Sequence, residues 1–120
     1  MSLFRKLSRG RSAASRWKPS GKAGVRAYAI GDIHGCLDLL DALLERIEAD
    51  AAARSPKRTW IVFLGDLIDR GPDSAGVIER LRDYRPDFAT PVFLAGNHEE
   101  VLLRTLGGEP EILADWLKFG

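Results

Sequence analysis

Three short apolar segments, each followed directly by a glycine, constrain the fold of this chain most strongly. They span residues 25–30, 59–64 and 91–95 and are rich in the β-branched and aromatic side chains that favour strands. The segment 59–64 is apolar nearly throughout, a pattern typical of a strand covered on both faces. Segments with helical spacing lie between them, so strand and helix alternate about every thirty residues. This alternation predicts right-handed βαβ crossovers and a parallel sheet.

The helical segments are recognised from the spacing of their apolar residues and from their start and stop signals. The first helix presents one apolar face, made of Leu37, Leu40, Leu44 and Ile47. The second helix is expected to start at residues 72–74 and presents Val77, Ile78, Leu81 and Tyr84. A third helix is expected over residues 99–106, ended by two glycines, and a fourth from Pro110.

Each predicted strand ends at a polar motif. The motifs are GDIHG at residues 31–35, GDLIDRG at residues 65–71 and GNHEE at residues 96–100. In parallel sheets the ligand site lies beyond the carboxyl ends of the strands, so the three motifs are expected to converge on one rim. The first glycine of each motif, Gly31, Gly65 and Gly96, is expected to let the backbone turn sharply and a ligand approach closely.

The residue types in these motifs predict a metal centre built on oxygen ligands. Two histidines and one cysteine are too few for a histidine-rich or thiolate cage. Asp32 and His34, one residue apart, can share one cation. Asp66 offers a carboxylate that can bridge two divalent ions about 3.5–4 Å apart. Asn97 offers a neutral carbonyl oxygen to the second ion.

Three further residues predict phosphate chemistry. Arg70 presents a planar fork of donors that matches two phosphate oxygens. His98 is placed to act as an acid rather than a ligand, and Asp69 can orient it. Together the motifs describe metal-assisted attack of water on a phosphoryl group. The alternative is that Asp32 caps the helix after it and that Asp69 and Arg70 form a surface ion pair worth under about 1 kcal/mol.

The motifs GDIHG, GDLIDRG and GNHE, in this order and each after a strand, resemble the signature of the phosphoprotein phosphatase family of binuclear metallophosphoesterases. The resemblance covers about residues 25 to 106. That family contains serine/threonine protein phosphatases and symmetrical bis(5'-nucleosyl)-tetraphosphatases. The resemblance implies an α/β fold, a calcineurin-like β-sandwich flanked by helices, of which this chain would supply the N-terminal βαβαβ half.

The resemblance also implies a role for each site residue. The implied metal ligands are Asp32 and His34 for the first ion, Asp66 for both ions and Asn97 for the second. Arg70 and Asn97 would contact the substrate phosphate, and His98 would protonate the leaving oxygen with support from Asp69. The implied cofactors are two divalent metal ions, with Mn²⁺ as the first choice and iron, zinc or nickel as alternatives.

The chain departs from the family after the third motif. Family members carry two further metal-ligating histidines and a second phosphate-binding arginine there, but no histidine follows His98 in this sequence. Asp66 and Asn97 alone are too few ligands to hold a second ion tightly. Half a sandwich would also leave an apolar sheet face bare. The chain is therefore interpreted as the N-terminal portion of a longer gene product, or as a truncated gene.

The charge of the chain is divided between two regions. Residues 1–31 carry eight basic and no acidic residues, whereas residues 32–120 carry ten basic and 17 acidic ones. The net charge of +1 is therefore the sum of a basic N-terminal segment and an acidic remainder. Residues 1–24 are expected to form a basic, disordered tail and residues 25–120 the domain portion. A transit peptide and a lipid-contacting segment are alternatives for the tail. No stretch has the length of a transmembrane segment or the pattern of a secretory signal.

These observations predict a cytoplasmic, metal-dependent enzyme that hydrolyses phosphomonoesters, with phosphoserine or phosphothreonine proteins, or a small phosphoester, as substrate. Hydrolysis of diadenosine tetraphosphate is an alternative, because the same metal centre serves both reactions. A third hypothesis is a truncated, catalytically incomplete fragment with at most weak metal binding. Nucleic-acid binding is not expected, because the basic tail lacks regularly spaced stacking aromatics. The sequence leaves the oligomeric state open.

Overall fold

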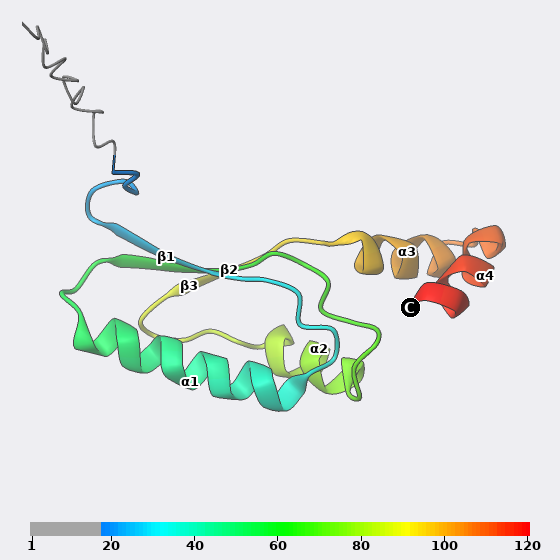
Figure 1. The fold of residues 1–120 in the computed structure, drawn as a ribbon, viewed down its shortest axis with the longest axis horizontal. Helices are drawn as coiled ribbons and strands as arrows, with labels where there is room; N and C mark the ends of the chain where they lie inside the picture. The colour runs from blue at the N-terminus through cyan, green and yellow to red at the C-terminus, as the bar shows by residue number, and fades with distance from the viewer. Residues whose placement is uncertain (1–17) are drawn as a thin grey trace, which may run out of the picture.

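The computed structural model describes residues 18–120, which form three strands and four helices (Figure 1). In chain order they are β1 (Val25–Ile30), α1 (Leu37–Ala53), β2 (Arg58–Phe63), α2 (Ser74–Arg82), β3 (Thr90–Phe93), α3 (Asn97–Leu106) and α4 (Pro110–Phe119). Most of the predicted tail, residues 1–17, lies outside the described residues. No helix of the described part combines the length and the apolar character needed to cross a membrane.

The strands form one parallel sheet in the order β1-β2-β3, which confirms the predicted α/β topology. The register places Ile30, Phe63 and Phe93, the last residues of the three strands, side by side. The Leu94 N–H donates to the Phe63 carbonyl at 2.9 Å just beyond this row. All three strands therefore end at the same edge, and their polar motifs begin there.

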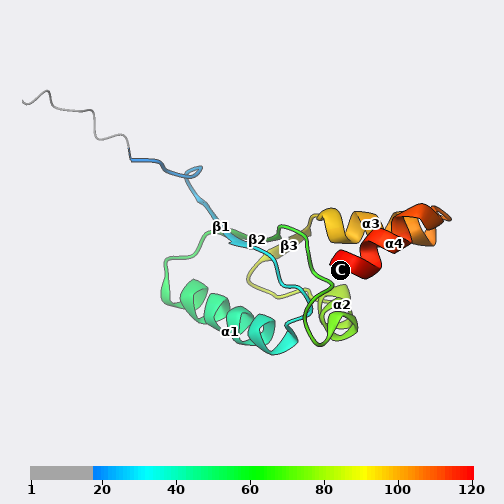
Figure 2. The ribbon, with the colours of Figure 1, turned by 45° about the vertical axis from the view of Figure 1, so that its right-hand side comes forward.

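Helices α1 and α2 lie together on one face of the sheet (Figures 1 and 2). Between them and the sheet lies the core, in which Ile61, Phe63 and Val77 are fully buried. Burying a side chain of this size stabilises a fold by about 1.5–3 kcal/mol. The apolar faces of α1 and α2 thus hold β2 in place, and with it the edge of the sheet at which the polar motifs begin.

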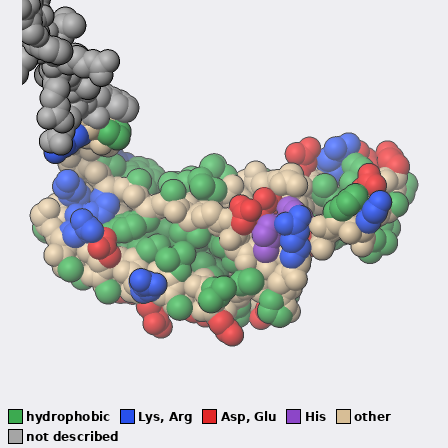
Figure 3. Space-filling model, in the orientation of Figure 1, with side chains coloured by type: hydrophobic (Ala, Val, Ile, Leu, Met, Phe, Trp, Pro, Cys, Tyr) green, Lys and Arg blue, Asp and Glu red, His purple; other side chains and the backbone are tan. Residues whose placement is uncertain are grey.

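The opposite face of the sheet is covered by no element within residues 18–120, so the expected two-sided cover of β2 is absent from this part of the chain. Burial along β2 alternates, because Thr59, Ile61 and Phe63 face the helices and the residues between them face the other way. The register puts Ala29, Val62 and Val92 in one row of that other face. This bare apolar face agrees with the N-terminal portion of a sandwich. Figure 3 shows hydrophobic side chains over the sheet and α1, with histidine and acidic side chains toward α3.

The element boundaries follow local hydrogen bonds. Helix α2 starts where expected, because the Asp73 carboxylate accepts from the Gly76 N–H at 2.7 Å. Helix α3 starts two residues before the expected Glu99, because the side chain of Glu99 accepts from the Gly96 N–H and caps the helix. Strand β3 ends two residues earlier than expected, since its pairing with β2 stops at Phe93.

Candidate metal centre

The loop after β1 and the loop after β2 are held together by backbone hydrogen bonds. The N–H groups of Ile33 and His34 both donate to the Asp66 carbonyl, at 3.0 and 2.9 Å, and the Gly35 N–H donates to the Leu67 carbonyl at 2.9 Å. These bonds place GDIHG alongside GDLIDRG. The expected convergence of the first two motifs on one rim is therefore confirmed by the backbone.

Asp32, His34 and Asp66 come together as a metal-ligand group. Each offers one ligand atom, and these atoms all lie within 4.8 Å of one another. The Nε2 atom of His34 is 3.7 Å from the Asp32 Oδ2 atom. A mixed carboxylate and imidazole set of this kind suits a divalent first-row transition metal.

The tautomer of His34 is set by its backbone partner. The His34 Nδ1 atom lies 2.8 Å from the Ile68 carbonyl oxygen. A carbonyl oxygen only accepts, so Nδ1 carries the proton and donates it. The Nε2 lone pair of the neutral ring is then free on the side of Asp32 and Asp66. Metal-ligating histidines commonly have this second hydrogen bond, which fixes ring orientation and tautomer.

The side chain of Asn97 faces the Asp66 carboxylate. In one amide orientation its Nδ2 donates to both carboxylate oxygens at 3.2 Å. In the other orientation its Oδ1 faces the same two acceptors, an arrangement that a cation between them would satisfy. The pair that was predicted to hold a second ion is thus in place, and its donor set fits a cation.

Glu99 fixes the loop that carries the ligands, a role that the sequence analysis missed. Its carboxylate accepts backbone N–H groups from Asp66 and Leu67 at 2.7 Å, from Ile68 at 3.3 Å and from Gly96 at 2.8 Å. One carboxylate therefore joins the second motif to the third. Its position three residues after Gly96 is the capping-box position and was the available sequence signal.

His98 and Asp69 form a partly buried pair next to the ligands. The His98 Nδ1 atom is 2.9 Å from the Asp69 Oδ2 atom, and the two side chains are 9% and 13% exposed. The His98 backbone N–H donates to the Asp66 Oδ1 atom at 3.2 Å. The His98 and His34 rings pack edge to face, with their centroids 4.8 Å apart. The pair therefore adjoins the metal-ligand group.

Arg70 is exposed in the loop after Asp69. Among residues 18–120 its guanidinium has no hydrogen bond or ion pair, so the structure does not join it to the other site residues and leaves its donors free. Within residues 18–120, four non-glycine residues adopt left-handed backbone angles, and all are candidate site residues: His34, Asp66, Asp69 and Arg70, with φ of 44°, 51°, 71° and 66°. Such conformations cost about 1–3 kcal/mol each and cluster at functional sites.

The three strand-end glycines are not equivalent. A Cβ atom at Gly96 would lie 2.5 Å from the Asp66 nitrogen, and one at Gly65, where φ is +100°, would lie 2.7 Å from the Gly96 Cα. At these two positions it is protein atoms of the neighbouring motif that approach closely, whereas the predicted approach of a ligand stays a prediction. At Gly31 no protein atom lies within 4 Å of the added Cβ, and the predicted approach of a ligand there stays a prediction.

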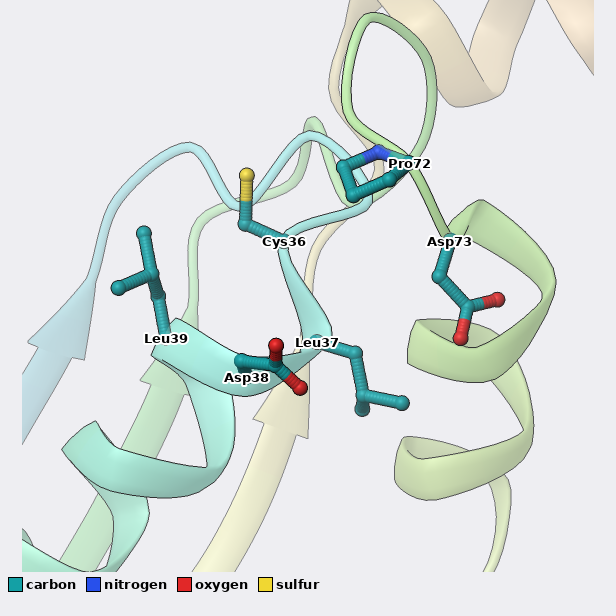
Figure 4. Close-up of a pocket in the computed structure, with 6 residues that line it drawn as sticks. All are labelled: Cys36, Leu37, Asp38, Leu39, Pro72 and Asp73. Atoms are coloured by element: carbon teal, nitrogen blue, oxygen red, sulfur yellow. The ribbon is translucent and has the colours of Figure 1, made fainter.

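Among the cavities formed by residues 18–120, two lie at the loop after β1 and the start of α1. One of about 500 Å³ lies between the starts of α1 and α2 and is lined by Cys36, Leu37, Asp38, Leu39, Pro72 and Asp73 (Figure 4). None of the metal-ligand group lines it. The other, of about 390 Å³, has Asp32 and His34 in its wall together with apolar side chains of α1. Only this second cavity opens directly on the candidate ligands.

Parallel strands that bring carboxylate and histidine side chains to one edge, beside a His–Asp pair, form the arrangement expected of a metallophosphoesterase. The model of the calcineurin-like phosphoesterase family matches residues 25–119. The chain therefore belongs to the calcineurin-like phosphoesterase family, whose members are metal-dependent.

Curated relatives carry two different names. The chain is 42% identical over 84 residues to a symmetrical bis(5'-nucleosyl)-tetraphosphatase of Dechloromonas aromatica, covering 70% of this chain and 28% of that protein. It is 38% identical over 93 residues to serine/threonine-protein phosphatase 1 of Salmonella typhimurium, covering 78% of this chain and 38% of that protein. The chain thus spans between about a quarter and two fifths of the length of these relatives. No solved structure matched the chain.

Proposed function

We propose that the protein containing this chain is a metal-dependent phosphoesterase, with phosphoserine or phosphothreonine proteins as substrates. The observation that carries the proposal is the convergence of the Asp32, His34 and Asp66 ligand atoms within 4.8 Å beside the His98–Asp69 pair. The match to the calcineurin-like phosphoesterase family supports the same reaction class.

The proposed cofactors are two divalent ions, with Mn²⁺ first and iron, zinc or nickel as alternatives. Asp32, His34 and Asp66 would hold one ion, and Asp66 with Asn97 would contribute to the second. When bound, such ions neutralise phosphate charge and lower the pKa of a water nucleophile. The Ile68 carbonyl keeps the His34 Nε2 lone pair available, and Glu99 keeps Asp66 in position.

The remaining site residues have proposed roles toward the phosphate and the leaving group. Arg70 binds phosphate oxygens, since its guanidinium is free of partners among residues 18–120 and forms bidentate bonds to such anions. His98 gives a proton from Nε2 to the leaving oxygen, because its Nδ1 is engaged by Asp69 at 2.9 Å. Asp69 orients the imidazole.

A second substrate is favoured by the relatives. Several of them are named symmetrical bis(5'-nucleosyl)-tetraphosphatases, among them the one from Dechloromonas aromatica. Hydrolysis of diadenosine tetraphosphate is therefore the alternative function. Comparing kcat/KM for a phosphoserine peptide with kcat/KM for diadenosine tetraphosphate separates the two.

The reaction class is tested by hydrolysis of p-nitrophenyl phosphate by the full-length gene product loaded with Mn²⁺. Asp66→Asn removes a carboxylate from the ligand group and is expected to lower kcat/KM by at least about 100-fold. Asp87→Asn, at an exposed aspartate outside the site, is the matched control and should leave the rate unchanged. An inactive wild-type protein, or equal rates for Asp66→Asn and wild type, would refute the proposal.

A further inference from the structure

Helix α4 brings a tryptophan to the proposed acid pair. The Trp116 Nε1–H group donates to the Asp69 Oδ2 atom at 2.7 Å, across 47 residues of sequence. Helix α4 runs back along α3, so that its end lies near the loop that carries Asp69 (Figures 1 and 2). The indole therefore reaches the site from an element outside the three motifs.

The indole N–H donates its hydrogen bond to the same carboxylate oxygen that accepts from His98. The Asp69 Oδ2 atom accepts from the His98 Nδ1 atom at 2.9 Å and from Trp116 at 2.7 Å. An indole N–H only donates, so this contact needs Asp69 as an acceptor. With both donors in place, rotation of the carboxylate away from the imidazole would break two hydrogen bonds instead of one.

The backbone of Asp69 is held separately from its side chain. The Asp69 N–H donates to the Ser74 hydroxyl oxygen at 2.9 Å, in a residue whose φ is 71°. Ser74 therefore fixes the main chain and leaves the carboxylate to be oriented by His98 and Trp116. The side chain of Trp116 is half-buried and lines a shallow groove with Ile68 and Leu102, where reduced contact with water strengthens a hydrogen bond.

We propose that Trp116 is a positioning residue that orients Asp69 and, through it, the proton-donating ring of His98. This inference rests on the proposed function, because it assigns His98 the transfer of a proton to the leaving oxygen. Trp116 makes no contact with the phosphate, and its effect is confined to the step in which the bond to the leaving oxygen breaks.

The test uses Trp116→Phe in the full-length gene product loaded with Mn²⁺, because this change keeps an aromatic ring and removes the N–H. Phenolate is a poor leaving group that needs the proton, whereas p-nitrophenolate leaves largely without it. We expect kcat for phenyl phosphate to fall at least about tenfold, kcat for p-nitrophenyl phosphate to fall less than about twofold, and KM to stay within about twofold. Trp60→Phe, on strand β2 away from the site, is the matched control and should alter neither rate.

A second measurement does not depend on turnover. With indole-selective ¹⁵N labelling, the Trp116 N–H signal, assigned from its absence in Trp116→Phe, should exchange slowly with solvent in wild type and rapidly in Asp69→Ala. Equal losses for the two phosphate esters, no loss, or fast exchange in wild type would each overturn the positioning role. A wild-type protein that hydrolyses neither ester would refute the proposed function instead, and the exchange data would still report whether the indole bond exists.

Discussion

Replacing Gly96 by alanine tests whether the third motif positions Asp66, the proposed bridging ligand in the second motif. The added Cβ atom would collide with the Asp66 carboxylate and would lie 2.5 Å from the Asp66 nitrogen and 2.7 Å from its Cγ atom. Ordinary Cβ contacts begin at 3.4 Å, so the Asp66 nitrogen and Gly96 must separate by about 0.9 Å. This nitrogen is a backbone atom and donates to the Glu99 Oε2 atom at 2.7 Å, so a side-chain rotation cannot relieve the clash.

This displacement is large compared with what a metal site accepts. Metal–ligand distances in proteins hold to about ±0.2 Å, so Asp66 cannot keep its place relative to Asp32 and His34. Loss of support for a ligand weakens metal affinity by about 10- to 100-fold, or about 1.4–2.8 kcal/mol. The forced separation should also lower the free energy of unfolding by about 1–3 kcal/mol, the usual cost of overpacking.

The assay is calorimetric titration of the 120-residue chain with Mn²⁺, accompanied by urea unfolding. Gly31→Ala is the matched control: it is the first glycine of another strand-end motif, but its added Cβ meets nothing within 4 Å. We expect it to bind Mn²⁺ like wild type. The reasoning is refuted if Gly96→Ala and Gly31→Ala bind Mn²⁺ with equal affinity. More than one tightly bound ion per wild-type chain would contradict the incomplete second site.

Two further predictions concern carboxylates outside the ligand group, the half-buried Glu99 and the more exposed Asp50. Glu99→Gln replaces one accepting oxygen by an amide that cannot accept, so it should lower the free energy of unfolding by about 1.5–3 kcal/mol in urea denaturation. The exposed neighbouring change Glu100→Gln should cost less than about 0.5 kcal/mol, and equal costs would contradict the role of Glu99. The pKa of Asp50 is held below its usual 3.8 by the hydrogen bond from Arg54, then by that from Tyr28. The contribution of Asp50 to stability is therefore present above pH 3.8 and is lost as the pH falls below that value. Asp50→Asn should then flatten the decline of Tm in this acid range. An unchanged Tm profile would show that this exposed cluster contributes nothing to stability.

The parts of the site that could be predicted from sequence are those fixed by topology. Asp32 and Asp66 follow neighbouring parallel strands, so the register alone brings them to one edge, and His34 comes with Asp32. The first two helices were likewise predicted from apolar spacing, because their leucine and valine side chains have only one sheet face to cover.

The parts that were missed depend on how α3 and α4 dock. Glu99 meets backbone groups about thirty residues away, and Trp116 meets Asp69 across a still longer separation. Neither contact has a periodic signature, because each requires a helix end to lie against one particular loop. The difference between Gly96, which Asp66 approaches closely, and Gly31, which no protein atom approaches within 4 Å, has a related cause: it depends on neighbours in space, and the motif letters do not specify these.

The polar contacts of α3 and α4 with the rest of the chain have a thermodynamic consequence. Glu99, His98 and Trp116 all attach to residues 66–69, the stretch that also carries a candidate metal ligand. We therefore expect docking of these two helices and completion of the centre to form one cooperative equilibrium rather than two. A ligand that binds only the completed centre would shift that equilibrium toward the docked state. Its apparent Kd would equal its intrinsic Kd divided by the fraction of molecules in which the helices are docked.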